Sequence, residues 1–289
     1  MSVPGTASLR HASTVVFAAV LLGCGETPQP PTSSARANDA APTLITLAPH
    51  LTELVYSAGA GRQLIAVVEY SDHPPAASEL PRIGDAFRVD LERITEFSPD
   101  IILAWDGGNP DAMIMQLQRR GFRVEVITTD TLDDVPLAIK QIGALAGTQQ
   151  QATSAASSYR ERLQRLRARY SSAERQRVLY QISAQPLYTI GARHPITEMI
   201  ETCGGQNIFA DVKQVAPAVT VEEVIVRAPQ VIIAGDPPGD ELLQLWQRWP
   251  QLPAVADSRL YTVDASLVAR SSARILDGLQ AICTHLNDS

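Results

Sequence analysis

VDLERITEFSPDIILAW occupies Val89–Trp105, and a second stretch of the same pattern, VTVEEVIVRAPQVIIAG, occupies Val219–Gly235. The offset is 130 residues throughout, from 89 to 219 and from 105 to 235. Each stretch has a polar N-cap candidate, Asp90 or Thr220, and then a short helical pattern. The helix stops at Ser-Pro or Ala-Pro because proline disfavours helix in the residue before it, and an aliphatic strand follows. The repeated helix–strand unit predicts two related lobes of α/β structure.

Units of helix, proline and strand also occur in α/β chains without any duplication, so the pattern alone leaves both explanations open. Glu92 and Glu222 stand at matching positions of the two stretches. That match favours duplication, and it places one carboxylate near the start of a short helix in each lobe.

Strands and helices alternate with short connections on both sides of these stretches. Strands are predicted at residues 44–47, 64–68, 100–105 and 123–128, and again at 177–182, 187–190, 230–234 and 260–263. Helical patterns lie between them, including 111–120, 196–203 and a final helix over 272–286. This alternation predicts a mostly parallel sheet covered by helices in each lobe.

Residues 149–172 contain neither proline nor glycine, and helical spacing is shown by Tyr159, Leu163, Leu166 and Tyr170. At about 1.5 Å per residue, such a helix is about 35 Å long, comparable with the diameter of a domain. We therefore expect an α/β fold of two lobes joined by one long α-helix, a stiff connection that predicts little closure of one lobe on the other.

The first residues differ in character from the rest of the chain. Arg10 and His11 precede an apolar run, Val15–Leu22, which is shorter than the roughly 20 residues of a membrane span and fits the core of a signal peptide. The run ends in Leu-Leu-Gly-Cys, which resembles a bacterial lipobox and predicts cleavage before Cys24 and lipidation of its thiol. The alternative is an ordinary signal peptide followed by an incidental cysteine.

The segment after Cys24 is rich in Pro, Ser, Ala and Thr and buries too little apolar surface to fold, so it is typical of a tether. The predicted organisation is then a signal peptide (1–23), a lipidated flexible tether (24–41), an N-terminal lobe (42–147), a connecting helix (148–173) and a C-terminal lobe (174–289). Export leaves Cys203 and Cys283, which form either a disulfide or two separate buried thiols.

Composition and motifs exclude several functions. The formal net charge is −7 and no Lys/Arg block occurs, so we expect no nucleic acid partner. The sequence has no His-Glu-x-x-His, P-loop, Gly-x-Ser-x-Gly or Cys-x-x-Cys motif, and its histidines are scattered, so we expect neither an enzyme nor a metal site. His50 lies at the mouth of the first strand, where α/β folds bind ligands, and we expect a satisfied surface histidine, with capping or ligand contact as the alternatives.

Six segments together resemble the periplasmic vitamin B12-binding proteins of bacterial ABC importers: ITLAPHLTEL (45–54), YSDHPP (70–75), LERI (91–94), SPDIILAWDGGN (98–109), CGGQNIF (203–209) and ARSSARI (269–275). The resemblance covers about residues 42–286. It implies the class III periplasmic binding protein fold, a lipoprotein anchored in the periplasm, and a disulfide between Cys203 and Cys283. It also implies that cobalamin or a related corrinoid is the transported ligand rather than a cofactor.

The resemblance further implies the ligand contacts. A corrin ring is broad, flat and edged with amides, so it needs apolar faces and a few polar groups. Tyr70 and Trp105 in the first lobe and Tyr188 in the second match aromatic contacts of the family, and Arg270 matches a basic residue near the ligand. Phe87 is expected to replace a family tryptophan that falls on Ala86.

Other interpretations of these residues stay open. Trp105 could be a core residue, and Arg270 could begin the last helix or form a surface ion pair. A family tryptophan falls on Ala216 and a family aspartate on Ser266, so the ligand could be a different corrinoid or another large planar molecule. Haem or a ferric siderophore is the alternative ligand, with Tyr70 or Tyr188 as the iron-ligating candidate.

Glu92 and Glu222 correspond to family glutamates that dock onto arginines of the two permease halves. The resemblance thus implies a monomer that delivers its ligand to an ABC permease with its ATPase. Matching charges on both lobes suit a two-fold permease, and charge pairs of this kind mainly set encounter rate and orientation. Ordinary solvated helix carboxylates are the alternative, as is a periplasmic sensor of the same fold without transport.

Overall fold

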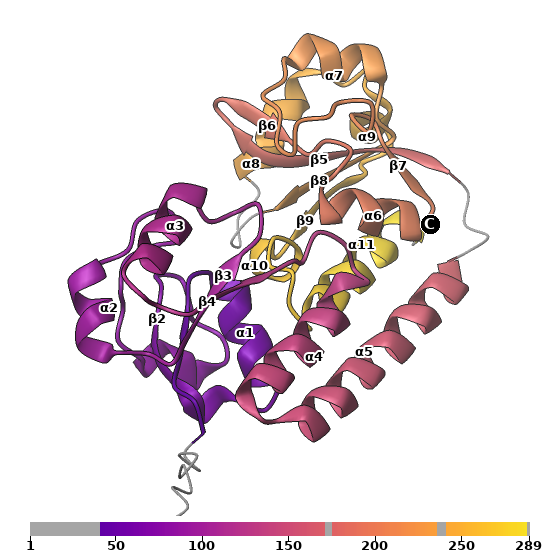
Figure 1. Cartoon of the computed structure of the whole chain (residues 1–289). Helices are drawn as coiled ribbons and strands as arrows, with labels where there is room; N and C mark the ends of the chain where they lie inside the picture. Colours follow the sequence, from indigo (N-terminus) through magenta and orange to yellow (C-terminus); the bar gives the residue numbers. More distant parts are fainter. Residues whose placement is uncertain (1–40, 171–174, 236–240, 288–289) are drawn as a thin grey trace, which may run out of the picture. The chain divides into compact units, whose positions relative to one another are not determined.

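The computed structural model describes residues 41–170, 175–235 and 241–287 (Figure 1). The predicted signal peptide, the lipidation at Cys24 and nearly all of the predicted tether lie outside these residues. Within them, no helix combines the length and apolar character that crossing a membrane requires.

The first lobe is built on a four-stranded sheet in which every pair of neighbours is parallel. Its order is β2-β1-β3-β4, made by β1 (Leu44–Thr46), β2 (Leu64–Val67), β3 (Ile101–Trp105) and β4 (Val124–Ile127). Such parallel pairs need crossover connections, and helices supply them. The predicted parallel sheet is therefore confirmed, with strand ends within two residues of the expected ones.

The second lobe repeats this arrangement. The strands β5 (Gln176–Ala184), β7 (Gly205–Asn207), β8 (Val231–Gly235) and β9 (Leu260–Val263) are parallel where they pair, in the order β7-β5-β8-β9. This is the connection order of β2-β1-β3-β4. An added strand, β6 (Leu187–Thr189), pairs antiparallel with the end of β5 and makes the sheet mostly, rather than wholly, parallel.

The repeated sequence unit has the same structure in both lobes. The helices α2 (Leu91–Phe97) and α7 (Val221–Arg227) are offset by 130 residues, as are β3 and β8. Asp90 caps α2 by accepting hydrogen bonds from two backbone N–H groups, and Thr220 forms a capping box with Glu223 at α7. Ser98 and Ala228, the residues before the prolines, leave the helix with φ of 47° and 45°.

The remaining helices lie around the two sheets, with α5 on the outer side of α4 (Figure 1). They are α1 (Pro49–Ser57), α3 (Asp111–Arg119), α4 (Asp134–Ala146), α5 (Gln149–Tyr170), α6 (Pro195–Thr202), α8 (Glu241–Gln244), α9 (Pro253–Ala256), α10 (Ala265–Val268) and α11 (Ile275–Asn287), with single 3-10 turns at Gly61–Gln63, Pro75–Glu79 and Leu245–Arg248. The final helix begins at Ile275, three residues later than predicted.

The long helix α5 contacts both lobes, and its role as their connection stays a prediction. It packs against α4 of the first lobe and against α6 and α11 of the second. Its buried side chains belong to one apolar cluster that also contains core residues of β1, β3 and α1 and of β5, α6 and α11. Arg167 adds ion pairs to Asp133 at the start of α4 and to Glu198 on α6.

Cys203 and Cys283 form a disulfide, so the prediction of a disulfide is confirmed against that of two separate thiols. The bond ties the end of α6 to α11. Residues 40–289 form one compact unit. A core shared between the lobes, together with α5 and these ties, opposes large movements of one lobe against the other. The exact limits predicted for the lobes stay predictions.

Candidate functional site

A cavity of about 320 Å³ lies between the two lobes. The first lobe lines it with Trp105, Asp106, Gly107, Thr129 and Asp130, and the second with Arg193, His194, Pro195, Val215, Val268, Ala269 and Ser271. The first-lobe residues end or directly follow β3 and β4. The cavity thus opens at the carboxyl ends of parallel strands, which is where α/β sheets bind ligands.

Trp105 is the predicted ligand contact that the structure places on the cavity wall. Its backbone N–H donates to Asn109 Oδ1 over 2.6 Å, and its ring packs edge-on against His50 with centroids 4.9 Å apart. Gly108 lies so close to the indole that an added Cβ would come within 2.0 Å of a ring carbon. A half-buried tryptophan fixed in this way offers a rigid apolar surface to a ligand.

His50 is buried behind Trp105, so the expectation of a surface histidine was wrong. Its Nε2 lies 3.4 Å from Thr129 Oγ1, on the cavity wall. The pKa of His50 is lowered to about 4, mainly by burial; the charge of Glu53 opposes this shift and that of Arg270 adds to it. The imidazole is therefore neutral at neutral pH and supports the tryptophan as a packing group.

Phe87 belongs to a loop that is tied to Trp105 but does not line the cavity. Asn109 Nδ2 donates to the carbonyls of Leu47 and Ala86, and so fixes the position of the loop. The Phe87 side chain is 70% exposed and lines a separate groove of about 240 Å³ between the loop and α3. The structure thus brings the loop near the site without placing the ring in it.

Tyr70 and Tyr188 are also absent from the residues that line the cavity. Tyr70 lies after β2 with φ of 63° and is 75% exposed. Tyr188 lies on β6 and is 38% exposed, beside a backbone bridge to Ala218. Aromatic side chains are enriched in binding interfaces, and both of these keep a large part of their surface exposed. Their ligand roles stay predictions.

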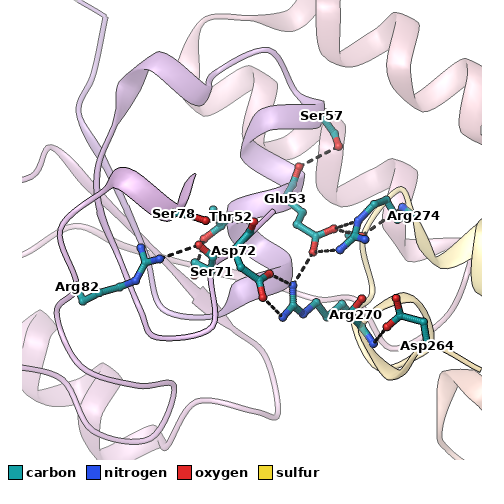
Figure 2. A network of polar contacts seen from close by, with 12 residues as sticks. Thr52, Glu53, Ser57, Ser71, Asp72, Ser78, Arg82, Asp264, Arg270 and Arg274 are labelled. Carbon is teal, nitrogen blue, oxygen red and sulfur yellow. Dashed lines mark hydrogen bonds and ion pairs between the residues drawn. The ribbon is translucent and has the colours of Figure 1, made fainter. Parts of the chain in front are cut away.

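Arg270 belongs to a network that crosses from one lobe to the other (Figure 2). Its guanidinium donates to Glu53 on α1 over 3.2 Å and to the carboxylate of Asp72. Arg274 donates to both oxygens of Glu53 over 2.8 and 3.0 Å, and Ser272 Oγ donates over 2.6 Å. We call Glu53, Asp72, Arg270 and Arg274 the inter-lobe clamp.

Glu53 is the centre of the inter-lobe clamp, because it is only 4% exposed and accepts from three side chains. Burial alone would raise the pKa of Glu53, but hydrogen bonds from Arg274 and Ser272 outweigh burial and lower it. The carboxylate is thus ionised and fully paired. Arg270 is engaged by carboxylates of the first lobe, while its neighbours Ala269 and Ser271 line the cavity.

A second hollow of about 380 Å³ adjoins the cavity and shares Asp130, Arg193 and His194 with it. His194 caps α6 by accepting from the Ile196 N–H over 3.1 Å, and burial lowers the pKa of His194 to about 4. No group of three or more His, Cys, Asp or Glu in the described ranges is arranged to hold a metal ion.

Several of these residues escaped the sequence reasoning. Asp106 directly follows the strand that ends at Trp105, and Thr129 and Asp130 come within three residues of the strand end at Ile127, so the carboxyl-end rule would have found them. Glu53 stands among apolar residues in PHLTELVY, and a charge inside such a pattern is a signal of burial. The sequence around the partners of Glu53, residues 270–274, does not indicate that they are buried against it. Of the two family departures, Ala216 is exposed and the Ser266 N–H donates to Asp264 at the start of α10.

Glu92 and Glu222 are exposed in the first turns of α2 and α7. They occupy equivalent places in the two lobes, because the helices that carry them and the strands that follow are equivalent. The docking role stays a prediction.

Comparisons with known proteins agree with this architecture. The periplasmic binding protein family model matches residues 44–267. The vitamin B12-binding protein of Vibrio cholerae is 37% identical over 244 residues, 84% of this chain and 88% of that protein. That of Pectobacterium carotovorum is 36% identical over 245 residues, 84% and 87% of the two chains.

Among solved structures, the periplasmic vitamin B12-binding protein BtuF of Vibrio cholerae matches with a TM-score of 0.81 at 36% identity, covering 86% of this chain and 97% of that one. The haem-binding protein HutB of Vibrio cholerae matches with a TM-score of 0.74 at 22% identity, covering 86% and 100%. At this identity, the similarity to the haem-binding protein supports the fold but no particular ligand.

Proposed function

This chain belongs to the periplasmic binding protein family, and we propose that it captures cobalamin or a related corrinoid between its lobes and delivers it to an ABC import permease. The observation that carries the proposal is the cavity between the lobes, walled by the fixed indole of Trp105. Relatives that are 36–37% identical over most of their length bear the name of vitamin B12-binding proteins.

The dimensions of the cavity favour a ligand that extends beyond it. About 320 Å³ is at the lower end of the range of small-molecule sites. A broad corrin ring would rest on Trp105 and reach outward, and the exposed rings of Tyr70, Phe87 and Tyr188 supply the apolar surface for contacts outside the cavity.

We propose binding without catalysis. The cavity holds a hydroxyl beside an imidazole, Thr129 and His50, but a histidine whose pKa is about 4 is a poor general base at neutral pH. The family consists of binding proteins, in agreement with this proposal.

Calorimetric titration of the purified chain with cyanocobalamin tests the binding proposal. We expect saturation at one ligand per chain, and Trp105→Ala is expected to weaken binding. Titration with haem under the same conditions tests the alternative ligand. Saturable binding of haem without binding of cyanocobalamin would replace corrinoid transport with haem transport.

We further propose that Glu92 and Glu222 dock the loaded monomer onto arginines of the two permease halves, where the ATPase drives import. Their exposure and equivalent positions support this role. Uptake by a reconstituted importer should fall when both are replaced by alanine, while ligand binding should persist. The matched control is the pair Glu96→Ala and Glu161→Ala, exposed helix carboxylates outside these positions. Unchanged uptake in the first pair would favour a sensor that does not transport.

Finally, we propose that the chain is exported to the periplasm by the signal peptide at 1–23 and anchored by lipid on Cys24. The lipobox pattern and the tether composition support this. Mass spectrometry of the mature N-terminus should find a lipidated cysteine, and Cys24→Ser should release the protein from membranes. An unmodified Cys24 in the mature protein would contradict the anchor.

A further inference from the structure

The positive charges beside the cavity are almost all neutralised within the protein. In the inter-lobe clamp, the two guanidiniums of Arg270 and Arg274 face the two carboxylates of Glu53 and Asp72. The clamp therefore has no net formal charge, and Arg270 has no surplus positive charge to offer a ligand.

The two histidines at the cavity add no positive charge at neutral pH. His50 lies behind Trp105, and His194 lines the wall. Burial lowers the pKa of each to about 4, well below that of an ordinary histidine, so both imidazoles are neutral at neutral pH.

The charged side chains that remain on the described cavity wall carry a net negative charge. Asp106 and Asp130 line it from the first lobe, both exposed, and Arg193 lines it from the second. Arg193 has no ion pair recorded within residues 41–170, 175–235 and 241–287. Two carboxylates against one guanidinium leave a formal charge of −1. The adjoining hollow adds Glu198, which Arg167 pairs, and the exposed Glu201.

The carboxylates already repel one another. Burial raises the pKa of Asp130, and the charges of Asp106 and Asp134 raise it further. Asp134 accepts from the backbone N–H and the hydroxyl of Thr131, and Asp106 accepts from the Thr128 hydroxyl, the one hydrogen bond of its carboxylate within the described part of the chain. A ligand group with another negative charge would therefore enter an unfavourable field, whereas the N–H of a carboxamide would find free acceptors.

We infer that Asp106, Asp130 and Arg193 select ligands by the charge of their edge, admitting planar ligands edged with carboxamides and rejecting those edged with carboxylates. Carboxamide N–H groups donate to the two aspartates, and carboxamide carbonyls accept from Arg193. This inference rests on the proposed corrinoid function and names the substrate class within it: amidated corrinoids rather than their acid precursors or dicarboxylate macrocycles such as haem.

The test compares two corrinoids that share a ring and differ in their edges, dicyanocobinamide and dicyanocobyrinic acid, by calorimetric titration of the full chain at neutral pH. We expect the amide to bind at least about tenfold more tightly at low salt, a modest value for like charges at an interface. The ratio should shrink between about 0.05 M and about 0.5 M salt, because the repulsion is screened.

In Asp106→Asn/Asp130→Asn the ratio of the two affinities should fall toward one, and in Arg193→Gln it should rise. Asp257→Asn, the same change at an exposed position near the opposite ends of the strands, is the control and should keep the wild-type ratio. Equal binding of both corrinoids by the wild type, or an unchanged ratio in the double variant, overturns the charge selection and leaves corrinoid binding in place. No binding of either corrinoid overturns both.

Discussion

Removing the charge of Glu53 should destabilise the protein far more than removing that of Asp72, although both carboxylates bind Arg270. Glu53 is 4% exposed, while Asp72 is 60% exposed. Breaking a buried ion pair from one side costs about 3–5 kcal/mol, because the partner is left buried and unpaired. The side chains of Arg270 and Arg274 retain 15% and 24% exposure, so water offsets part of this cost.

We therefore expect Glu53→Gln to lower the free energy of unfolding by about 3 kcal/mol, and Asp72→Asn by less than about 1 kcal/mol, as for an exposed pair. For a chain of this size, these values correspond to falls in Tm of about 6–12 °C and less than about 4 °C. Thermal and urea unfolding followed by circular dichroism measure both. Equal losses in the two variants would refute the assignment of Glu53 as the centre of the inter-lobe clamp.

The pH dependence gives a second readout of the same prediction. The pKa of Glu53 is lower in the folded protein than in the unfolded chain. Its stabilisation is therefore present above the unfolded pKa and is lost as the pH falls through the folded one. Glu53→Gln should lack this part of the acid-induced loss, so the difference in stability between wild type and variant should shrink in acid. A constant difference would mean that the carboxylate charge is not the cause.

Three further predictions follow from the site and the core. Trp105→Ala should weaken cyanocobalamin binding by about 10–100-fold, as expected for a buried aromatic contact, while Trp249→Ala, outside the cavity, should not; equal effects in calorimetry would contradict the site. Replacing Cys203 and Cys283 by serine should lower the free energy of unfolding by about 2–5 kcal/mol in urea titrations, and an unchanged midpoint would contradict a stabilising disulfide. The lowered pKa of His50, about 4 against an ordinary 6.5, means that the unfolded state binds more protons between these values, so stability falls as the pH decreases through them. In His50→Asn the free energy of unfolding should fall less steeply with decreasing pH. A pH profile identical to that of the wild type would refute this role of His50.

The elements that the sequence predicts well are those with strong local signals. The unit at 89–105 and its repeat are specified by caps, prolines and aliphatic runs, and both take the expected structure. The long helix has no breaker from Gln149 to Tyr170 and is found there. The disulfide was one of two open alternatives, and the proximity of α6 and α11 decides it.

The elements that sequence reasoning missed depend on tertiary contacts. The strand β7, Gly205–Asn207, has no apolar pattern and exists through its pairing with β5. The last helix begins after Ser272, whose hydroxyl donates to Glu53, 219 residues away in the chain, a contact that no local pattern indicates. The burial of His50 likewise depends on Trp105, at the end of β3, and on Thr129, in the segment after β4. Among the residues that line the cavity, Trp105 is the one that the family resemblance indicated.

A structure of the chain with bound cyanocobalamin is the most direct measurement. The proposal predicts the corrin ring between the lobes, within about 4 Å of Trp105 and in contact with residues of both sheets' loops. A corrin bound to one lobe alone, or on a face that leaves the indole of Trp105 uncovered, would contradict capture in the cavity.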